Sequence, residues 1–249
     1  MSKASITTQE AIITIGAAKM KLYVATPDNA HQAPALIVLQ EAFGVNSHIR
    51  SVCERFAREG FVAVAPELFH RSGSGLEFKY DEFAKIKPIF SAITNEQLAE
   101  DLAATFRWLH DAPNVDPHRI SVIGYCMGGF AATLAACTLP VKTAISYYGG
   151  GIVEARPGLA MRPLLPEFHK LKAPALFIFG DQDHGIPESQ IEAIRAELIK
   201  QKKAHEIVVY PGAEHGFFCD ERASYNAEAA AKAWDRTLAW LNEGNRKTQ

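Results

Sequence analysis

Short apolar runs alternate with amphipathic stretches along most of the chain. The apolar runs lie at residues 36–39, 61–65, 120–124, 143–147, 175–179 and 207–210. Between them apolar residues recur at helical spacing, as in Ile49, Val52 and Phe56 after the capping residue Asn46. Strands that alternate with helices favour a mostly parallel central sheet flanked by helices. The pattern therefore predicts an α/β fold.

Three further segments have patterns of their own. Residues 11–15 and 20–24 flank the turn at 16–18, which predicts an N-terminal antiparallel hairpin. Residues 67–93 have no clear period, and we expect them to be a cover segment over a functional site. Thr94 and Gln97 fit a capping box that opens a helix. Two more helices are expected from Pro187 and from about Asn226.

Composition bounds the class of protein. The 249 residues suit one domain over residues 1–249, and 48% of them are apolar. A net charge of -2 favours neither nucleic acid nor an anionic membrane as a partner. No export signal or membrane span is recognised, and the four cysteines match no zinc or disulfide pattern. We expect a cytoplasmic protein with reduced thiols, either a monomer or a homodimer.

The most informative segment is Gly124-Tyr125-Cys126-Met127-Gly128, which directly follows an apolar strand. A strand that ends in Gly-x-nucleophile-x-Gly and leads into a helix is the nucleophile elbow of α/β-hydrolases. Cysteine stands here where most such enzymes have serine. The helix that begins near Gly128 points its N-terminus at Cys126, so the Met127 N–H is a candidate oxyanion donor.

An acid and a base follow in the chain order that this fold requires. Asp183 lies just after the strand at 175–179, and His215 lies just after the strand at 207–210. His215 would take the thiol proton, and Asp183 would orient the imidazole. Asp181 is the alternative acid, although it could instead serve the turn. His184 is expected at the rim.

These motifs, together with residues 40–46 and His215-Gly216-Phe217, resemble the dienelactone hydrolase (carboxymethylenebutenolidase) family of the α/β-hydrolase superfamily. The resemblance covers the chain from the hairpin onward and implies a triad of Cys126, Asp183 and His215. It also implies a glutamate beside the thiol, which is Glu41, and a second oxyanion N–H from Ala42. The family's reaction opens dienelactone to maleylacetate in aromatic compound degradation, and it needs no metal or cofactor.

The residues themselves leave two questions open. Glu41 follows an apolar strand, where it could cap a turn or hold the thiol proton in the resting enzyme. A thiolate is a good leaving group, so it favours activated esters or enol lactones as substrates. The family binds the substrate carboxylate with arginines, one of them a few residues beyond the histidine. Here the nearest candidate is Arg222, with Phe43 and Tyr80 as further substrate-binding candidates.

The sequence also contains other candidate cations and is compatible with two other functions. Arg50, Arg71, Lys85 and Lys87 are further possible anion partners, although each is also typical of a solvated surface charge. An α/β-hydrolase-like binding protein without catalysis is one alternative function. A redox-sensing thiol protein is another, and Cys219 would be its resolving cysteine.

Overall fold

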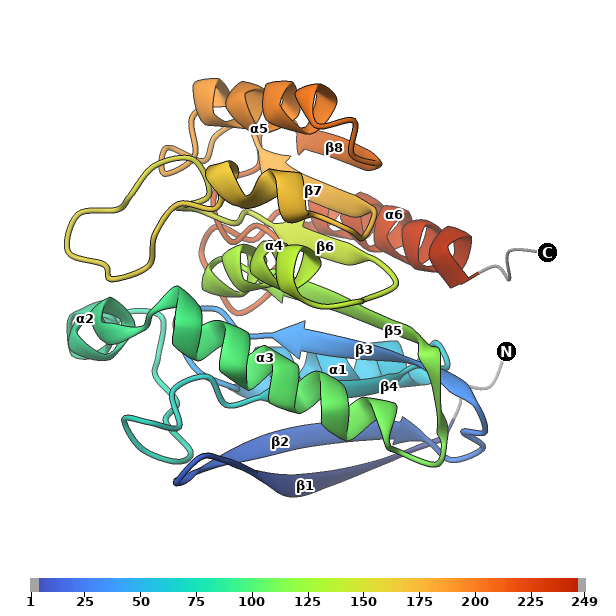
Figure 1. Ribbon diagram of the computed structural model, residues 1–249. Helices are drawn as coiled ribbons and strands as arrows, with labels where there is room; N and C mark the ends of the chain where they lie inside the picture. The colour runs from blue at the N-terminus through green and yellow to red at the C-terminus, as the bar shows by residue number, and fades with distance from the viewer. Residues whose placement is uncertain (1–4, 246–249) are drawn as a thin grey trace.

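The structure, a computed structural model, describes residues 5–245, so the ends of the expected domain at 1–4 and 246–249 lie outside it. An eight-stranded sheet forms the centre of the molecule in the order β1-β2-β4-β3-β5-β6-β7-β8 (Figure 1). The strands are β1 (Ile6–Ile15), β2 (Ala18–Pro27), β3 (Ala33–Leu39), β4 (Val62–Pro66), β5 (Val115–Tyr125), β6 (Ala144–Tyr147), β7 (Ala175–Gly180) and β8 (His205–Tyr210).

The strand directions confirm the expected fold class. β1 and β2 form an antiparallel hairpin, β2 also runs antiparallel to β4, and all other neighbours are parallel. The hairpin is longer than the sequence pattern predicts. Most side chains of β1 are exposed or only partly buried because it lies at the edge of the sheet, so no apolar run marks its beginning.

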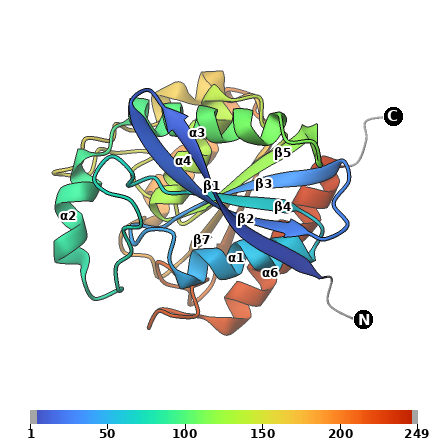
Figure 2. The same ribbon diagram turned by 90° about the horizontal axis from the view of Figure 1, so that it is seen from below.

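Helices cover both faces of the sheet, as Figure 2 shows from below. One face carries α1 (Ser47–Arg58) and α6 (Ala227–Asn245), which meet where Phe56 packs on Trp234 at 4.6 Å between ring centroids. The other carries α3 (Asn95–His110), α4 (Met127–Thr138), the 3-10 helix η1 (Leu165–Lys170) and α5 (Glu188–Lys200). Within the described residues, no helix combines the length and apolarity needed to cross a membrane.

The helix starts agree with the expected caps. The side chain of Asn46 accepts a hydrogen bond from the Ile49 N–H at 3.2 Å at the beginning of α1. Both bonds of the capping box between Thr94 and Gln97 are present at the beginning of α3. Capping contacts of this kind depend only on residues three apart, which is why the sequence predicts them well.

The cover segment (residues 67–93) contains a helix that the sequence pattern does not predict, α2 (Phe83–Ala92). Only Ile86 and Phe90 of this helix are buried, and Pro88 lies inside it, so no apolar stripe marks it. Figure 1 shows α2 beyond the carboxyl ends of the parallel strands, on the same side as the loop from β6 to η1. We call that loop, residues 148–164, the β6–η1 loop.

Candidate active site

Cys126 lies at the sharp turn between β5 and α4, with φ 56° and ψ -113°. A non-glycine residue at positive φ is strained and persists only where its surroundings fix it. Backbone packing does so here. A Cβ on Gly124 would lie 1.9 Å from the Gly128 carbonyl oxygen, and one on Gly128 would lie 2.3 Å from the Leu39 carbonyl oxygen. Both flanking glycines are therefore required by the close approach of β5, α4 and β3.

His215 and Asp183 meet at the carboxyl ends of β8 and β7. The Asp183 Oδ2 lies 2.6 Å from the His215 Nδ1, and the Asp183 side chain is 1% exposed. Its Oδ1 accepts a hydrogen bond from the Gly185 N–H at 2.9 Å. The exposed Asp181 instead accepts one from the Gly212 N–H at 2.7 Å, as a turn-serving residue would. Asp183 is thus the acid that contacts the histidine, and His184 is exposed.

The electrostatics couple His215 to the Cys126 thiol. Burial raises the pKa of Cys126, but the charge of His215 and its hydrogen bond to the thiol outweigh burial, so the pKa falls below its ordinary value. For His215, burial lowers the pKa, while the Cys126 charge and the hydrogen bond to Asp183 raise it to about 10. Each charge stabilises the other, which favours a thiolate–imidazolium pair.

Two backbone N–H groups are available beside the thiol. Met127 is the first residue of α4, so its N–H has no acceptor one helical turn earlier. The Ala42 N–H, just beyond β3, has no backbone or side-chain acceptor within the described residues. Both residues are buried. Together they have the properties required of oxyanion donors.

Glu41 is 1% exposed and is paired with Arg222, whose Nη1 donates to Glu41 Oε1 at 3.0 Å. The other carboxylate oxygen, Oε2, has no hydrogen-bond partner in the described part of the chain. The Glu41 charge also opposes His215 by raising the thiol pKa. A buried carboxylate oxygen without a hydrogen-bond donor destabilises the folded protein. A donor placed within hydrogen-bonding distance of Oε2 would remove that cost.

The sequence-predicted candidates for substrate binding gather around this pair. The Arg222 guanidinium lies 5.7 Å from the Phe43 ring centroid and 5.6 Å from that of Tyr80. These two rings meet edge to face at 4.6 Å. Arg50 and Arg71 do not belong to this group: Arg50 pairs with Glu77, and Arg71 pairs with Asp101 and Glu100. Lys85 pairs with Glu82, and Lys87 is exposed.

Three cysteines other than Cys126 are buried thiols, and burial raises the pKa of each. The Cys219 thiol donates a hydrogen bond to the Tyr80 hydroxyl at 3.1 Å. Burial raises the pKa of Cys219 to about 12. Cys219 also lies near His48 and Asp220, with one potential metal-ligand atom of each residue within 4.8 Å of the others. A metal there would need a Cys219 thiolate, which its raised pKa disfavours.

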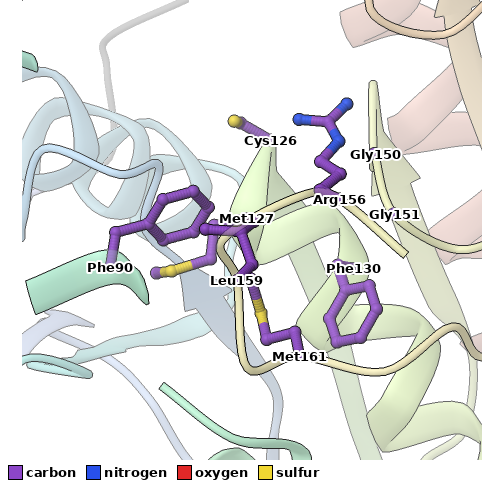
Figure 3. A pocket seen from close by; sticks show the side chains of 9 residues that line it. All are labelled: Phe90, Cys126, Met127, Phe130, Gly150, Gly151, Arg156, Leu159 and Met161. Carbon is purple, nitrogen blue, oxygen red and sulfur yellow. The ribbon is translucent and has the colours of Figure 1, made fainter. Parts of the chain in front are cut away.

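A cavity beside Cys126 contains an arginine that no sequence motif marks. Arg156, from the β6–η1 loop, lies beside Cys126 in Figure 3. The residues around the cavity are otherwise mainly apolar: Phe90, Cys126, Met127, Phe130, Gly150, Gly151, Leu159 and Met161. Its volume is about 10 Å³, the room of about one water-sized sphere. A substrate group therefore enters only when lining side chains move.

Comparison with known proteins places the chain in one family. The dienelactone hydrolase family model matches residues 20–244. A Synechocystis protein named "Putative carboxymethylenebutenolidase" is 42% identical over 86% of this chain and 87% of its own length. One of the same name from Escherichia coli K12 is 34% identical over 92% of this chain and 84% of its own.

Solved structures share the fold. The Klebsiella pneumoniae structure named "Putative Dienelactone Hydrolase" superposes with a TM-score of 0.87 at 35% identity, covering 96% of this chain and 99% of that one. A dienelactone hydrolase-like promiscuous phosphotriesterase from metagenomic libraries has a TM-score of 0.81 at 22% identity, with coverage of 96% and 98%. The second likeness, at this identity, shows the fold alone.

Proposed function

The chain belongs to the dienelactone hydrolase family and is a hydrolase of ester or lactone bonds, and on that premise we propose that it works through a Cys126 nucleophile. Its substrates would be activated esters or enol lactones such as dienelactone, which would be opened to maleylacetate. The observation that carries this proposal is the 2.6 Å contact between Asp183 and His215 at the sheet edge that also carries the strained Cys126.

In the first half-reaction the Cys126 thiolate attacks the substrate carbonyl carbon, and the new oxyanion accepts hydrogen bonds from the Met127 and Ala42 N–H groups. The bond from carbon to the ring or ester oxygen then breaks, the departing oxygen takes the Nε2 proton of the His215 imidazolium, and an acyl-thioenzyme with a neutral His215 remains. A thiolate is itself easily expelled, so this step goes forward only if the departing oxygen is a stabilised anion. An enolate meets that condition, and a simple alkoxide does not.

In the second half-reaction His215 takes a proton from water, and the resulting hydroxide attacks the thioester carbon. The carbon–sulfur bond breaks, the acid product leaves, and the thiolate is restored beside the imidazolium. Asp183 accepts the Nδ1–H of His215 and so leaves Nε2 for both proton transfers. No step requires a metal or a cofactor.

We also assign Glu41 a role in the resting enzyme. Its Oε2 has no donor among the described residues, and its charge raises the thiol pKa. The role applies to those molecules in which Cys126 carries its proton: the neutral thiol would donate to Oε2, satisfy that oxygen and be less open to stray electrophiles. Phe43, Tyr80 and Arg222 would line the substrate side of this carboxylate, since all three lie around it.

The test is ultraviolet-monitored hydrolysis of cis- and trans-dienelactone beside p-nitrophenyl acetate. Cys126→Ala and Asp183→Asn should each lower kcat/KM by at least about a thousandfold, because they remove the nucleophile and the group that orients the base. Asp181→Asn is the matched control, since Asp181 serves a turn, and it should stay within about threefold of the wild type. Turnover that survives Cys126→Ala would refute the mechanism. Ester cleavage without lactone cleavage would keep the mechanism and exclude dienelactone as the substrate.

A further inference from the structure

Two arginines whose charges act on Cys126 differ in how they are paired. Arg222 already has a buried carboxylate partner in Glu41. Arg156 forms no ion pair with any side chain that the structure describes; its Nη2 donates to the Gly185 carbonyl oxygen at 3.2 Å. Arg162, in the same β6–η1 loop, is paired with Glu96. Arg156 is thus a guanidinium beside the nucleophile with donors to spare, since each guanidinium carries five.

The chain makes room for this guanidinium. A Cβ on Gly150 would lie 1.9 Å from the Arg156 Nη2, so the arginine rests directly on glycine backbone at the end of β6. Figure 3 shows the Arg156 and Cys126 side chains at the same end of the cavity. The Arg156 charge also lowers the pKa of the Cys126 thiol. The positive charge of Arg156 therefore stabilises the thiolate form of Cys126.

The rest of the cavity is apolar. Phe90 contributes from α2, Phe130 from α4, and Leu159 and Met161 from the β6–η1 loop. Met161 and Met127 are flexible side chains that can repack around a ligand, as the small volume of the cavity requires. At one end of this apolar space lies a guanidinium that has no ion-pair partner among the described residues. Such a space suits a ligand with a hydrocarbon part and one carboxylate.

We propose that Arg156 is a specificity-determining residue that binds the carboxylate of an anionic substrate while the cavity receives its hydrocarbon part. This inference rests on the proposed function and adds which substrates the same nucleophile prefers. The guanidinium fork forms two parallel hydrogen bonds to a carboxylate, which a lysine cannot do. Arg222 would not supply this contact without first giving up Glu41.

The test compares two esters of equal length, p-nitrophenyl hydrogen glutarate, which carries a carboxylate, and p-nitrophenyl valerate, which does not. Arg156→Gln should lower kcat/KM for the glutarate ester about tenfold to a hundredfold, mainly by raising KM, because a charge-assisted contact is lost. The valerate ester should change by no more than about threefold, since its hydrocarbon contacts stay. Arg156→Lys should recover only part of the preference.

Arg162→Gln is the matched control, because it removes a loop arginine whose charge is already paired. An equal fall for both esters in Arg156→Gln would assign Arg156 to holding Gly185 and the Asp183 loop, and no change for either would remove it from the site. Both results would overturn the inference. Valerate cleavage that is lost in Cys126→Ala would still support the proposed function in either case. If neither ester is cleaved in a Cys126-dependent way, the proposed function itself fails.

Discussion

The nucleophile elbow and the cover segment beside it are held in place by different kinds of contact. At the elbow, backbone meets backbone, with no space for a Cβ at Gly124 or Gly128. In the cover segment, side chains contribute as well: the ion pair Arg50–Glu77 lies beside the backbone hydrogen bond from the Phe78 N–H to the Phe43 carbonyl oxygen at 3.0 Å. Close-packed backbone has essentially one arrangement, whereas a partly exposed ion pair such as Arg50–Glu77 is weak and easily exchanged. The position of Cys126 at the elbow is therefore fixed closely, whereas the cover segment can change its arrangement at a lower cost in free energy.

The largest expected effect breaks the elbow. Gly124→Ala would place a Cβ against the Gly128 carbonyl oxygen, and we expect it to lower the free energy of unfolding by about 3 kcal/mol or more. Gly75→Ala in the cover segment is the matched control. Unlike Gly124, Gly75 has positive φ, but nothing lies within 4 Å of its Cβ position, so the cost should be about 1 kcal/mol. Urea unfolding measures both, and equal losses would contradict the comparison.

The second effect concerns the reactivity of the elbow thiol. His215 lowers the pKa of Cys126, so the thiolate should persist below pH 9, the ordinary pKa of a thiol, and be lost as the pH falls through the lowered value. His215→Asn should move the midpoint of iodoacetamide alkylation upward and slow alkylation at pH 7 by about tenfold or more. His184→Asn, next to the acid but exposed, should leave the midpoint unchanged. A midpoint that His215→Asn does not move would show that the thiol is activated by something else.

The smallest effect loosens the cover segment. Arg50→Gln removes the partly exposed pair with Glu77 and should cost no more than about 1 kcal/mol in global unfolding. Amide hydrogen exchange should still speed up locally, at residues 76–80, because the pair holds this stretch to the beginning of α1. A loss of several kcal/mol would instead mean that the cover segment is part of the cooperative core.

The three residues of the proposed triad could be named from the sequence because of a property of parallel sheets. The carboxyl ends of β5, β7 and β8 share one edge, so residues that directly follow these strands come together even when they are far apart in the chain. The apolar runs mark those strand ends clearly. The sequence therefore names Cys126, Asp183 and His215, although it does not give the distance between any two of them.

Other features of the site could not be predicted, because they depend on contacts between side chains that no periodicity or motif in the sequence marks. The pair of Glu41 and Arg222 joins residues 181 positions apart, and no periodicity encodes it. Helix α2 lacks an apolar stripe because it is buried at only two positions. No motif marks Arg156, but it lies in the loop that follows β6, the strand beside β5. Residues that directly follow parallel strands meet at one edge of the sheet, and this holds for Arg156 as it does for Asp183 and His215.

The strand order also has a consequence for how the protein is made. The proposed nucleophile Cys126 directly follows β5, whereas His215, which lowers its pKa, follows β8, the last strand of the chain to be synthesised. A growing chain on the ribosome therefore carries Cys126 long before it carries His215. Until then the elbow cysteine has no imidazolium beside it and keeps an ordinary thiol's modest reactivity. The pKa of Cys126 therefore falls, and its reactivity rises, only after nearly all of the sheet has been synthesised.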